Sequence, residues 1–327
     1  GWTHLFSSTL FSTFTATGSR YLSTPEGDIA GTAFGQTNQV TDLSLKADVE
    51  YVPNERHAVR AGAWGGRLRF EISESFDGND TFDQRIGSLY GSAYVEDTFT
   101  PSPRWEVRAG LRLNAFESGS YWRLAPRLSV EYRPDPAWRL QAGYGRYYQF
   151  LTLDTSEFFT GFDEWLMVAD GVPPAYGDQF VLGVKTRVAE GWQLDVESYV
   201  RTMRGLFEVD PFLPDRAGVA YAQTFRFGEG VAAGGEVYLQ RTQGPLTGAV
   251  GYAFAPTGRR FPGVNVADAA PPTPPGTINT SSGDVGGYYA PRYDRLHDVT
   301  VNAGYALGDA WRVTGIFAFA TGQPFTE

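Results

Sequence analysis

Apolar and polar residues alternate strictly over long stretches of this chain. One stretch begins at Trp105 and alternates apolar with polar or small residues up to Ala115. Another begins at Trp138 and follows the same rule through Tyr144. A period of two places alternate side chains on opposite faces of a β-strand. These runs exceed the roughly 5–6 residues usual in soluble proteins and match the roughly 9–11 residues of a strand that crosses a membrane.

The same pattern predicts thirteen strands along the chain. They cover residues 4–17, 38–51, 57–68, 86–99, 104–116, 122–133, 137–148, 178–187, 191–203, 228–241, 245–255, 294–306 and 310–321. Short turns alternate with long connections at 18–37, 69–85, 149–177, 204–227 and 256–293, and only 117–121 is short among the latter. Short turns at one end and long loops at the other are typical of bacterial outer-membrane barrels, in which the short turns are periplasmic.

Four tryptophans occupy equivalent places in this pattern. Trp105, Trp138, Trp192 and Trp311 each follow a short turn and open a predicted strand. Aromatic residues gather where barrel strands meet lipid headgroups. We therefore predict that the four anchor the barrel at the periplasmic interface of a lipid bilayer.

The predicted fold class is all-β: a transmembrane antiparallel β-barrel in the bacterial outer membrane. Single-chain bacterial barrels have even numbers of strands, and unpaired strand edges are not tolerated in lipid. Thirteen strands are therefore an incomplete set. The sequence also begins without the features of a signal peptide and stops in what reads as the start of a loop. We expect residues 1–327 to be one barrel fragment of a longer chain.

Composition removes several other functions. The chain has no cysteine, so disulfides and thiolate metal sites are excluded. Its net charge of −10 argues against nucleic acid as a partner. Mean hydropathy is −0.28, which is compatible with a barrel because the polar inner face offsets the lipid-facing one.

Several short motifs together resemble the barrel of the TonB-dependent outer-membrane receptors, particularly the Oar-like branch. They include Tyr94–Phe99 followed by Pro101, Pro103 and a strand to Asn114, then residues 125–132, 143–147, 235–237, 293–297 and 321–326. Thr321 stands where the family pattern usually has serine. The resemblance runs from about Leu43 to the end and covers about thirteen of a probable 22 strands.

The resemblance implies a gated importer of a scarce nutrient, energised by a TonB-type protein through a plug domain. Neither the plug, the TonB-interacting segment nor the last barrel strands occur in this chain. Charges of both signs on the predicted inner face suit contact with such a plug, although a hydrated pore wall would also be polar. These candidate lumen or plug-facing residues are Arg108, Arg112, Arg127, Glu131, Glu197, Arg201 and Glu236.

Substrate capture is assigned to the long extracellular loops. Aromatic side chains can stack on ligands and arginines can hold anions, although both also pack loops together. The candidates are Phe150, Phe159 and Trp165 in one loop, and Arg259, Arg260, Tyr288 and Tyr289 in another. Nothing in the sequence selects among iron chelates, cobalamin, glycans and peptides, although long Oar-like loops favour peptide or protein ligands.

No residues suggest catalysis, and no cofactor is expected. The three histidines are far apart and lack metal-ligand spacing. Asp77, Asn79 and Asp83 offer oxygen ligands to calcium, but without the glycine and glutamate of an EF-hand loop. A solvated acidic loop is the alternative.

Two other functions stay open. A passive porin would have no plug and would conduct ions. A structural platform or subunit of an envelope complex would have its loops clamped against a partner.

Overall fold

The computed structural model describes residues 1–29, 31–154, 163–210, 216, 218–261, 287–291 and 293–324. Nearly all regular structure in these ranges is antiparallel β-strand, with one short 3-10 helix, η1 (Tyr221–Thr224). None of the helical segments found in these ranges has the length and apolar character needed to span a membrane.

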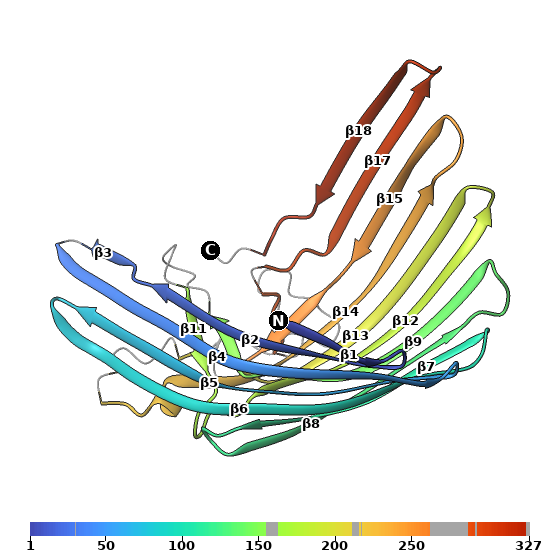
Figure 1. The fold of residues 1–327 in the computed structure, drawn as a ribbon. Coiled ribbons are helices and arrows are strands. Elements are labelled where there is room, and N and C mark those ends of the chain that lie inside the picture. The colour runs from blue at the N-terminus through green and yellow to red at the C-terminus, as the bar shows by residue number, and fades with distance from the viewer. Residues whose placement is uncertain are drawn as a thin grey trace.

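Sixteen strands form one strongly curved sheet (Figure 1). Neighbours follow each other along the chain except for β3 and β16, which pair only with β4 and β14. The main path is β1 (Trp2–Ser7), β2 (Leu10–Ser23), β4 (Thr32–Asn54), β5 (His57–Phe76), β6 (Asn79–Ser102), β7 (Trp105–Phe116), β8 (Tyr121–Tyr132), β9 (Trp138–Gln149), β12 (Ala175–Ala189), β13 (Trp192–Val209), β14 (Phe225–Arg241), β15 (Leu246–Phe254), β17 (His297–Leu307) and β18 (Trp311–Ala320). The side elements are β3 (Glu26–Ile29), β16 (Thr257–Arg260) and a separate hairpin of β10 (Leu151–Asp154) and β11 (Glu164–Met167).

The first predicted strand, 4–17, is wrong. It is two antiparallel strands, β1 and β2, which pair Trp2 with Phe14 around a turn at Ser8 and Thr9. The Ser7 hydroxyl accepts a hydrogen bond from the Thr9 amide at 3.2 Å and so closes this turn. Serine and threonine turns lack the strong glycine, proline or asparagine signal of most hairpins. The main path therefore contains one strand more than the sequence pattern predicts.

The predicted long loops at 18–37 and 69–85 are also wrong. Strands β4, β5 and β6 continue through them and are 23, 20 and 24 residues long. Such strands extend about 65–80 Å at ~3.3 Å per residue, far more than the ~30 Å hydrocarbon core requires. Asp77 and Gly78 alone connect β5 to β6, with φ of 51° and 74°. Two positive φ angles define the tight turn that best matches strand twist.

Contacts between distant strands identify the concave face of the sheet as its inner face. Phe70 on β5 lies 5.9 Å from the ring of Tyr221, which lies 4.8 Å from Phe225 on β14. Residues of strands well apart in the sheet can meet in this way only on the concave side. The opposite, outer face carries exposed apolar side chains over much of its area, including Leu43, Leu45 and Phe180.

The turns that connect β4 to β5, β6 to β7, β8 to β9, β12 to β13, β14 to β15 and β17 to β18 gather at one end of the sheet, whereas the two-residue β5–β6 turn lies at the other (Figure 1). Trp105, Trp138, Trp192 and Trp311 are the first residues of β7, β9, β13 and β18 at the former end. The pairing register places all four on the outer face, in line with residues such as Leu111, Leu140 and Val196. All four therefore lie on the outward side at one rim, and their role at the membrane interface stays a prediction.

Candidate functional site: the inner wall

The inner face is polar over its membrane-spanning height. Residues paired across neighbouring strands form rows on this face. One row consists of Glu106, Glu131, Gln141, Gly183, Glu197 and Glu236. A second row runs from Gly110 through Arg127, Gly145 and Gln179 to Arg201. Arg108 and Arg112 share the face of this second row, because they alternate with outward residues on β7. All seven residues predicted for the lumen therefore lie on one face.

Ion pairs neutralise the part of this wall near the short turns. Arg108 lies 3.8 Å from Glu96 and 3.4 Å from Glu106, and Arg139 lies 3.4 Å from Glu131. Lys185 and Asp195 are paired at 2.9 Å. The cation of each pair is exposed to solvent, so the pair contributes about 1 kcal/mol or less to stability. Their main effect is to keep this part of the wall hydrated and electrically balanced.

Nearer the long-loop end, three arginines instead lie over tyrosine rings. The guanidinium carbons of Arg112, Arg123 and Arg127 lie 4.9, 5.1 and 5.0 Å from the centroids of Tyr94, Tyr121 and Tyr147. Within the described ranges, none of the three has a carboxylate at ion-pair distance. Arg123 also donates from Nη1 to the Trp122 carbonyl at 2.9 Å. A cation held over an aromatic ring keeps its remaining N–H groups free to bind an anion.

Tyr147 is itself held by a glycine beneath it. A Cβ atom at Gly145 would lie 2.7 Å from the Tyr147 hydroxyl and 2.9 Å from its ring. A hollow of about 240 Å³ opens beside this stack. Among its lining residues are Glu96, Arg108, Arg127, Gly143 and Gln179.

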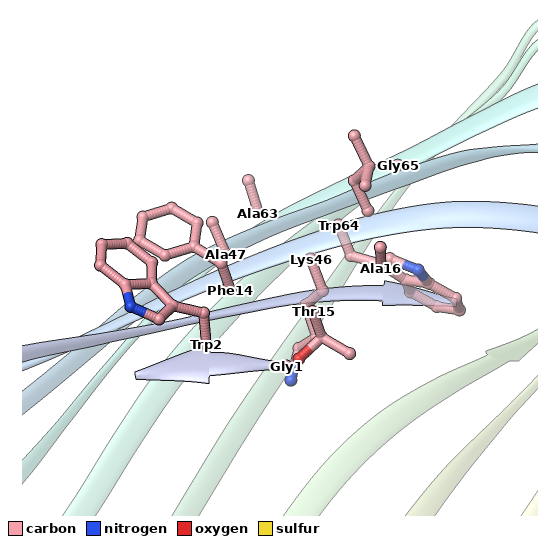
Figure 2. A pocket seen from close by; sticks show the side chains of 11 residues that line it. Gly1, Trp2, Phe14, Thr15, Ala16, Lys46, Ala47, Ala63, Trp64 and Gly65 are labelled. Atoms are coloured by element: carbon pink, nitrogen blue, oxygen red, sulfur yellow. The ribbon is translucent and has the colours of Figure 1, made fainter. Parts of the chain in front are cut away.

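A larger hollow of about 740 Å³ lies at the β1 edge of the sheet. Figure 2 shows Trp2 and Phe14 side by side at one end, Trp64 at the other, and Lys46 between them. The register places Phe14 on the outer face and Lys46 on the inner face. Because residues of both faces line it, this hollow is the space beside an open sheet edge rather than an enclosed binding cavity.

The β10–β11 hairpin lies against the inner face at the long-loop end. Asn38 on β4 donates from Nδ2 to the Trp165 carbonyl at 3.0 Å, and its Oδ1 accepts from the Trp165 amide at 2.9 Å. The Tyr221 hydroxyl donates to the Met167 carbonyl at 2.9 Å and accepts from the Met167 amide at 3.0 Å. These bonds satisfy backbone groups of β11 that no sheet neighbour reaches.

Around these bonds lies the main hydrophobic core of the described chain. It joins the hairpin segment to strands on both sides of the curved sheet. Its buried members are Val40, Leu68, Phe70, Ile72, Phe82, Phe116, Leu166, Met167, Val168, Ala169, Val172, Phe207, Tyr221 and Phe225. The long-loop end of the inner space is therefore filled by the chain itself beside the polar wall.

A buried carboxyl stands at the start of β11. Glu164 is only 5% exposed and accepts a hydrogen bond from Gln36 Nε2 at 2.5 Å. Burial raises the pKa of Glu164 to about 8, and the negative charges of Glu74 and Asp154 add to this while Arg216 opposes it. Arg216 is also bonded to Glu74. The hairpin thus carries a carboxyl that is mostly protonated at neutral pH.

Two of the predicted substrate-binding aromatics pack against other parts of the chain. Phe150 stacks on Phe116 at 5.1 Å, and Trp165 meets Tyr21 edge-on at 6.4 Å. Phe159 lies outside the described residues. The packing alternative that the sequence left open accounts for the positions of Phe150 and Trp165.

The two predicted anion-binding arginines point to opposite faces. Arg259 pairs with Gly230 and Arg260 with Glu229 on β14, so their side chains alternate. Arg259 donates to Glu208 at 2.6 Å, whereas Arg260 lies 3.5 Å from Glu229 and 5.8 Å from the Tyr288 ring. Tyr289 forms two backbone hydrogen bonds with Arg259. The four residues are neighbours, but the arginines cannot hold one anion together.

The acidic turn that offered calcium ligands has a structural role. Asp77 and Gly78 form the tight β5–β6 turn, and Asn79 donates to the Asp77 carbonyl at 3.1 Å. Asp83 lies 3.6 Å from Arg85. Across the described ranges, no three histidine, aspartate or glutamate side chains lie close enough together to hold a metal ion.

Sequence patterns missed Asp294 and Thr321 as joints of the wall. Asp294 is buried and its carboxylate accepts from the Thr257 amide at 3.0 Å, which fixes the start of β16. The Thr321 hydroxyl accepts from the His297 amide at 3.1 Å, and the Thr321 amide donates to the His297 carbonyl at 2.9 Å. The two motifs therefore meet where β17 begins and β18 ends.

A curved antiparallel sheet with an apolar outer face, a polar inner face and aromatic residues at one rim is the wall of a transmembrane β-barrel. The sequence matches the family model "TonB dependent receptor-like, beta-barrel" over residues 1–324. The chain therefore belongs to this family of bacterial outer-membrane proteins, whose members are transport proteins rather than enzymes. This confirms the resemblance to TonB-dependent receptors, without singling out the Oar-like branch.

Solved structures of the same fold include three iron-uptake receptors. The unliganded ferric citrate transporter FecA is 12% identical with a TM-score of 0.65, and the match covers 98% of this chain and 48% of that one. The ferric yersiniabactin uptake receptor FyuA of Yersinia pestis is 10% identical with a TM-score of 0.64, covering 96% and 51%. The ferric-catecholate import receptor Fiu of K12 E. coli, in its closed form, is 12% identical with a TM-score of 0.59, covering 95% and 51%.

The chain thus spans about half the length of these solved structures. A search of curated proteins finds no match to the sequence.

Proposed function

We propose that the polypeptide containing this chain imports a scarce anionic nutrient across the outer membrane in a TonB-dependent manner. Membership of the receptor-barrel family supports the transport class. The observation that carries the substrate class is a set of three arginines, Arg112, Arg123 and Arg127, each held over a tyrosine on the inner wall and none ion-paired with a carboxylate of the described residues. An anion moving past the wall meets these side chains without first having to displace a carboxylate.

Iron chelates suit this arrangement. The names of the three similar structures refer to ferric citrate, ferric yersiniabactin and ferric catecholate. Carboxylate and catecholate oxygens accept paired hydrogen bonds from a guanidinium. The proposal includes first capture by the extracellular loops 149–177 and 256–293. Its partners are a plug domain against the inner wall and a TonB-type protein that energises release.

The test is uptake of radiolabelled ferric citrate and a ferric catecholate by cells that produce the intact polypeptide. The variants are Arg112→Gln, Arg123→Gln and Arg127→Gln, and Arg187→Gln is the matched control because it lies on the same face near the short turns. A hydrogen bond to a charged group contributes about 1.5–3 kcal/mol, so each variant should weaken apparent affinity roughly ten- to hundredfold. Uptake should also stop when TonB is deleted.

Each arm can contradict a different part of the proposal. Uptake that continues without TonB, together with ion conductance in a planar bilayer, would favour the passive porin. TonB-dependent uptake that is equal in all four variants would refute the arginine assignment alone. Absence of both uptake and conductance for every probe would favour the structural platform.

A further inference from the structure

Three arginines cluster on the outer face of β2 and β5, away from the inner wall. Arg20 lies directly across from Thr41 on β4, and Thr41 lies across from Arg69 on β5. Arg67 stands one row nearer the short turns, between Leu43 and Leu89. Strand spacing places Arg67 about 7 Å from Arg69 along β5, and Arg20 about 10 Å away across two strand gaps. All three side chains are exposed.

Gly66 on β5 shows that these arginines point to the outer face of the sheet. A Cβ atom at Gly66 would lie 2.7 Å from both Ser44 Cβ and the Tyr90 hydroxyl. Tyr90 donates to Asp42 at 2.6 Å on the polar inner face. Arg67 is next to Gly66 on the strand and therefore points outward, beside Leu43 and Leu89, which are 68% and 55% exposed.

The cluster has little neutralisation from the protein. Among the described residues, neither Arg67 nor Arg69 has a hydrogen-bond or ion-pair partner, and Arg20 donates only to the uncharged Gln39 amide at 2.7 Å. Glu71, in the row above, is occupied by Arg85 at 3.1 Å. Three cations thus stand together on a chain whose net charge is −10.

Along the membrane normal, the cluster lies at the level of the outer-leaflet headgroups. Ser102 on β6 pairs with the interfacial Trp105, and Leu89 lies 13 residues farther along β6. That separation is about 43 Å along the strand, or roughly 33 Å along the membrane normal for a strand tilted by ~40°. The hydrocarbon core is about 30 Å thick, so Arg67 and Arg69 lie at the level of the outer headgroups.

We propose that Arg20, Arg67 and Arg69 bind the phosphorylated headgroup of an outer-leaflet lipid. The lipid's acyl chains lie on Leu43 and Leu89, which flank Arg67 in its row, and on Leu45 in the next row toward the short turns. Guanidinium groups match phosphate with paired N–H···O bonds, and basic clusters next to a membrane attract anionic lipids. The continuous apolar surface under the arginines favours a lipid over a free phosphate ion. This inference concerns the outer surface and does not depend on the proposed import function.

The test is native mass spectrometry of the intact polypeptide in detergent, titrated with phosphatidic acid or with phosphatidylcholine of the same acyl chains. The variant replaces Arg20, Arg67 and Arg69 with glutamine. Its control replaces Arg56, Arg104 and Arg187, which are exposed at the short-turn end. Each arginine near a membrane surface should change affinity about fivefold, so we expect roughly hundredfold weaker phosphatidic acid binding in the variant alone.

Three results would overturn the proposal. These are equal phosphatidic acid binding in variant and wild type, equal binding of phosphatidylcholine and phosphatidic acid by the wild type, and displacement of the lipid by an equal concentration of inorganic phosphate. If the triple variant does not fold, Arg67→Gln compared with Arg104→Gln applies the same criteria, with an expected loss of about fivefold.

Discussion

The β10–β11 hairpin can be seated, that is packed against the inner face, or released from it. The buried carboxyl of Glu164 makes this equilibrium depend on pH. Its pKa in the seated hairpin is about 8, above the ordinary value of 4.5. Between these values the seated form binds more protons than the released form, so the free energy of release decreases as pH rises. Seating is strongest below the ordinary pKa and is weakened until pH passes about 8.

The size of this effect follows from the shift. Each pKa unit corresponds to about 1.4 kcal/mol, so raising the pH from 6 to 8, where the group is half ionised, should cost roughly 2 kcal/mol of the free energy of release. That is roughly a thirty- to fiftyfold increase in the population of the released form. Arg216 and Glu74 also face Glu164, but they are bonded to each other and largely cancel.

The perturbation is Glu164→Gln, which keeps the shape and the neutral state of the side chain. Hydrogen exchange of the Trp165 and Met167 amides reports release, because these amides bond to Asn38 and Tyr221, which lie outside the hairpin. After correction for intrinsic exchange, wild-type protection should fall roughly thirty- to fiftyfold from pH 6 to 8. Protection in the variant should not change.

Asp170→Asn is the matched control, since it removes an exposed acid from the same segment. It should retain the wild-type pH dependence. The reasoning fails if wild-type protection is the same at both pH values, or if Glu164→Gln and wild type lose protection in parallel.

Further predictions concern the supports of the wall. Asn38→Ala should lower the free energy of hairpin release by about 1–3 kcal/mol, because it leaves the Trp165 backbone without its partners; faster exchange at Trp165 than in the outer-face control Gln39→Ala would be expected, and equal rates would contradict it. Gly62→Ala should cost about 1–3 kcal/mol, because its Cβ would lie 2.6 Å from the Tyr94 ring and 2.8 Å from the Ala47 carbonyl; denaturant unfolding should show this loss, whereas Gly87→Ala, with open space around it, should be near neutral. Trp105→Ala and Trp138→Ala should lower the thermal stability of the barrel in lipid more than Trp122→Ala in β8 does, if the short-turn girdle is the main anchor; equal effects would argue against that assignment.

Sequence reasoning identified the wall well where one chemical rule governs both faces. Alternation around Trp105 and Trp138 predicted most of the strands and separated the four tryptophans from the seven candidate lumen residues, because lipid outside and water inside demand opposite side chains. It could not foresee that Phe150 and Trp165 pack inward, since an aromatic residue in a loop satisfies packing or ligand binding equally. The arginine–tyrosine pairs were also out of reach, because Arg127 and Tyr147 come together only through the pairing of β8 with β9.

The two loop errors share a physical cause that also locates the membrane boundary. On β4 and β5, apolar residues point outward up to Leu43, and beyond it they point inward as Val40, Phe70 and Ile72. The phase inverts because lipid no longer covers the outer face, while the hairpin now covers the inner one. A sequence prediction that expects apolar residues on the same face throughout ends the strand where they switch faces, and it assigns the remaining residues to a loop. The inversion places Arg67 and Arg69 on the first outward positions beyond the lipid, which is the level at which a phosphorylated headgroup would meet them.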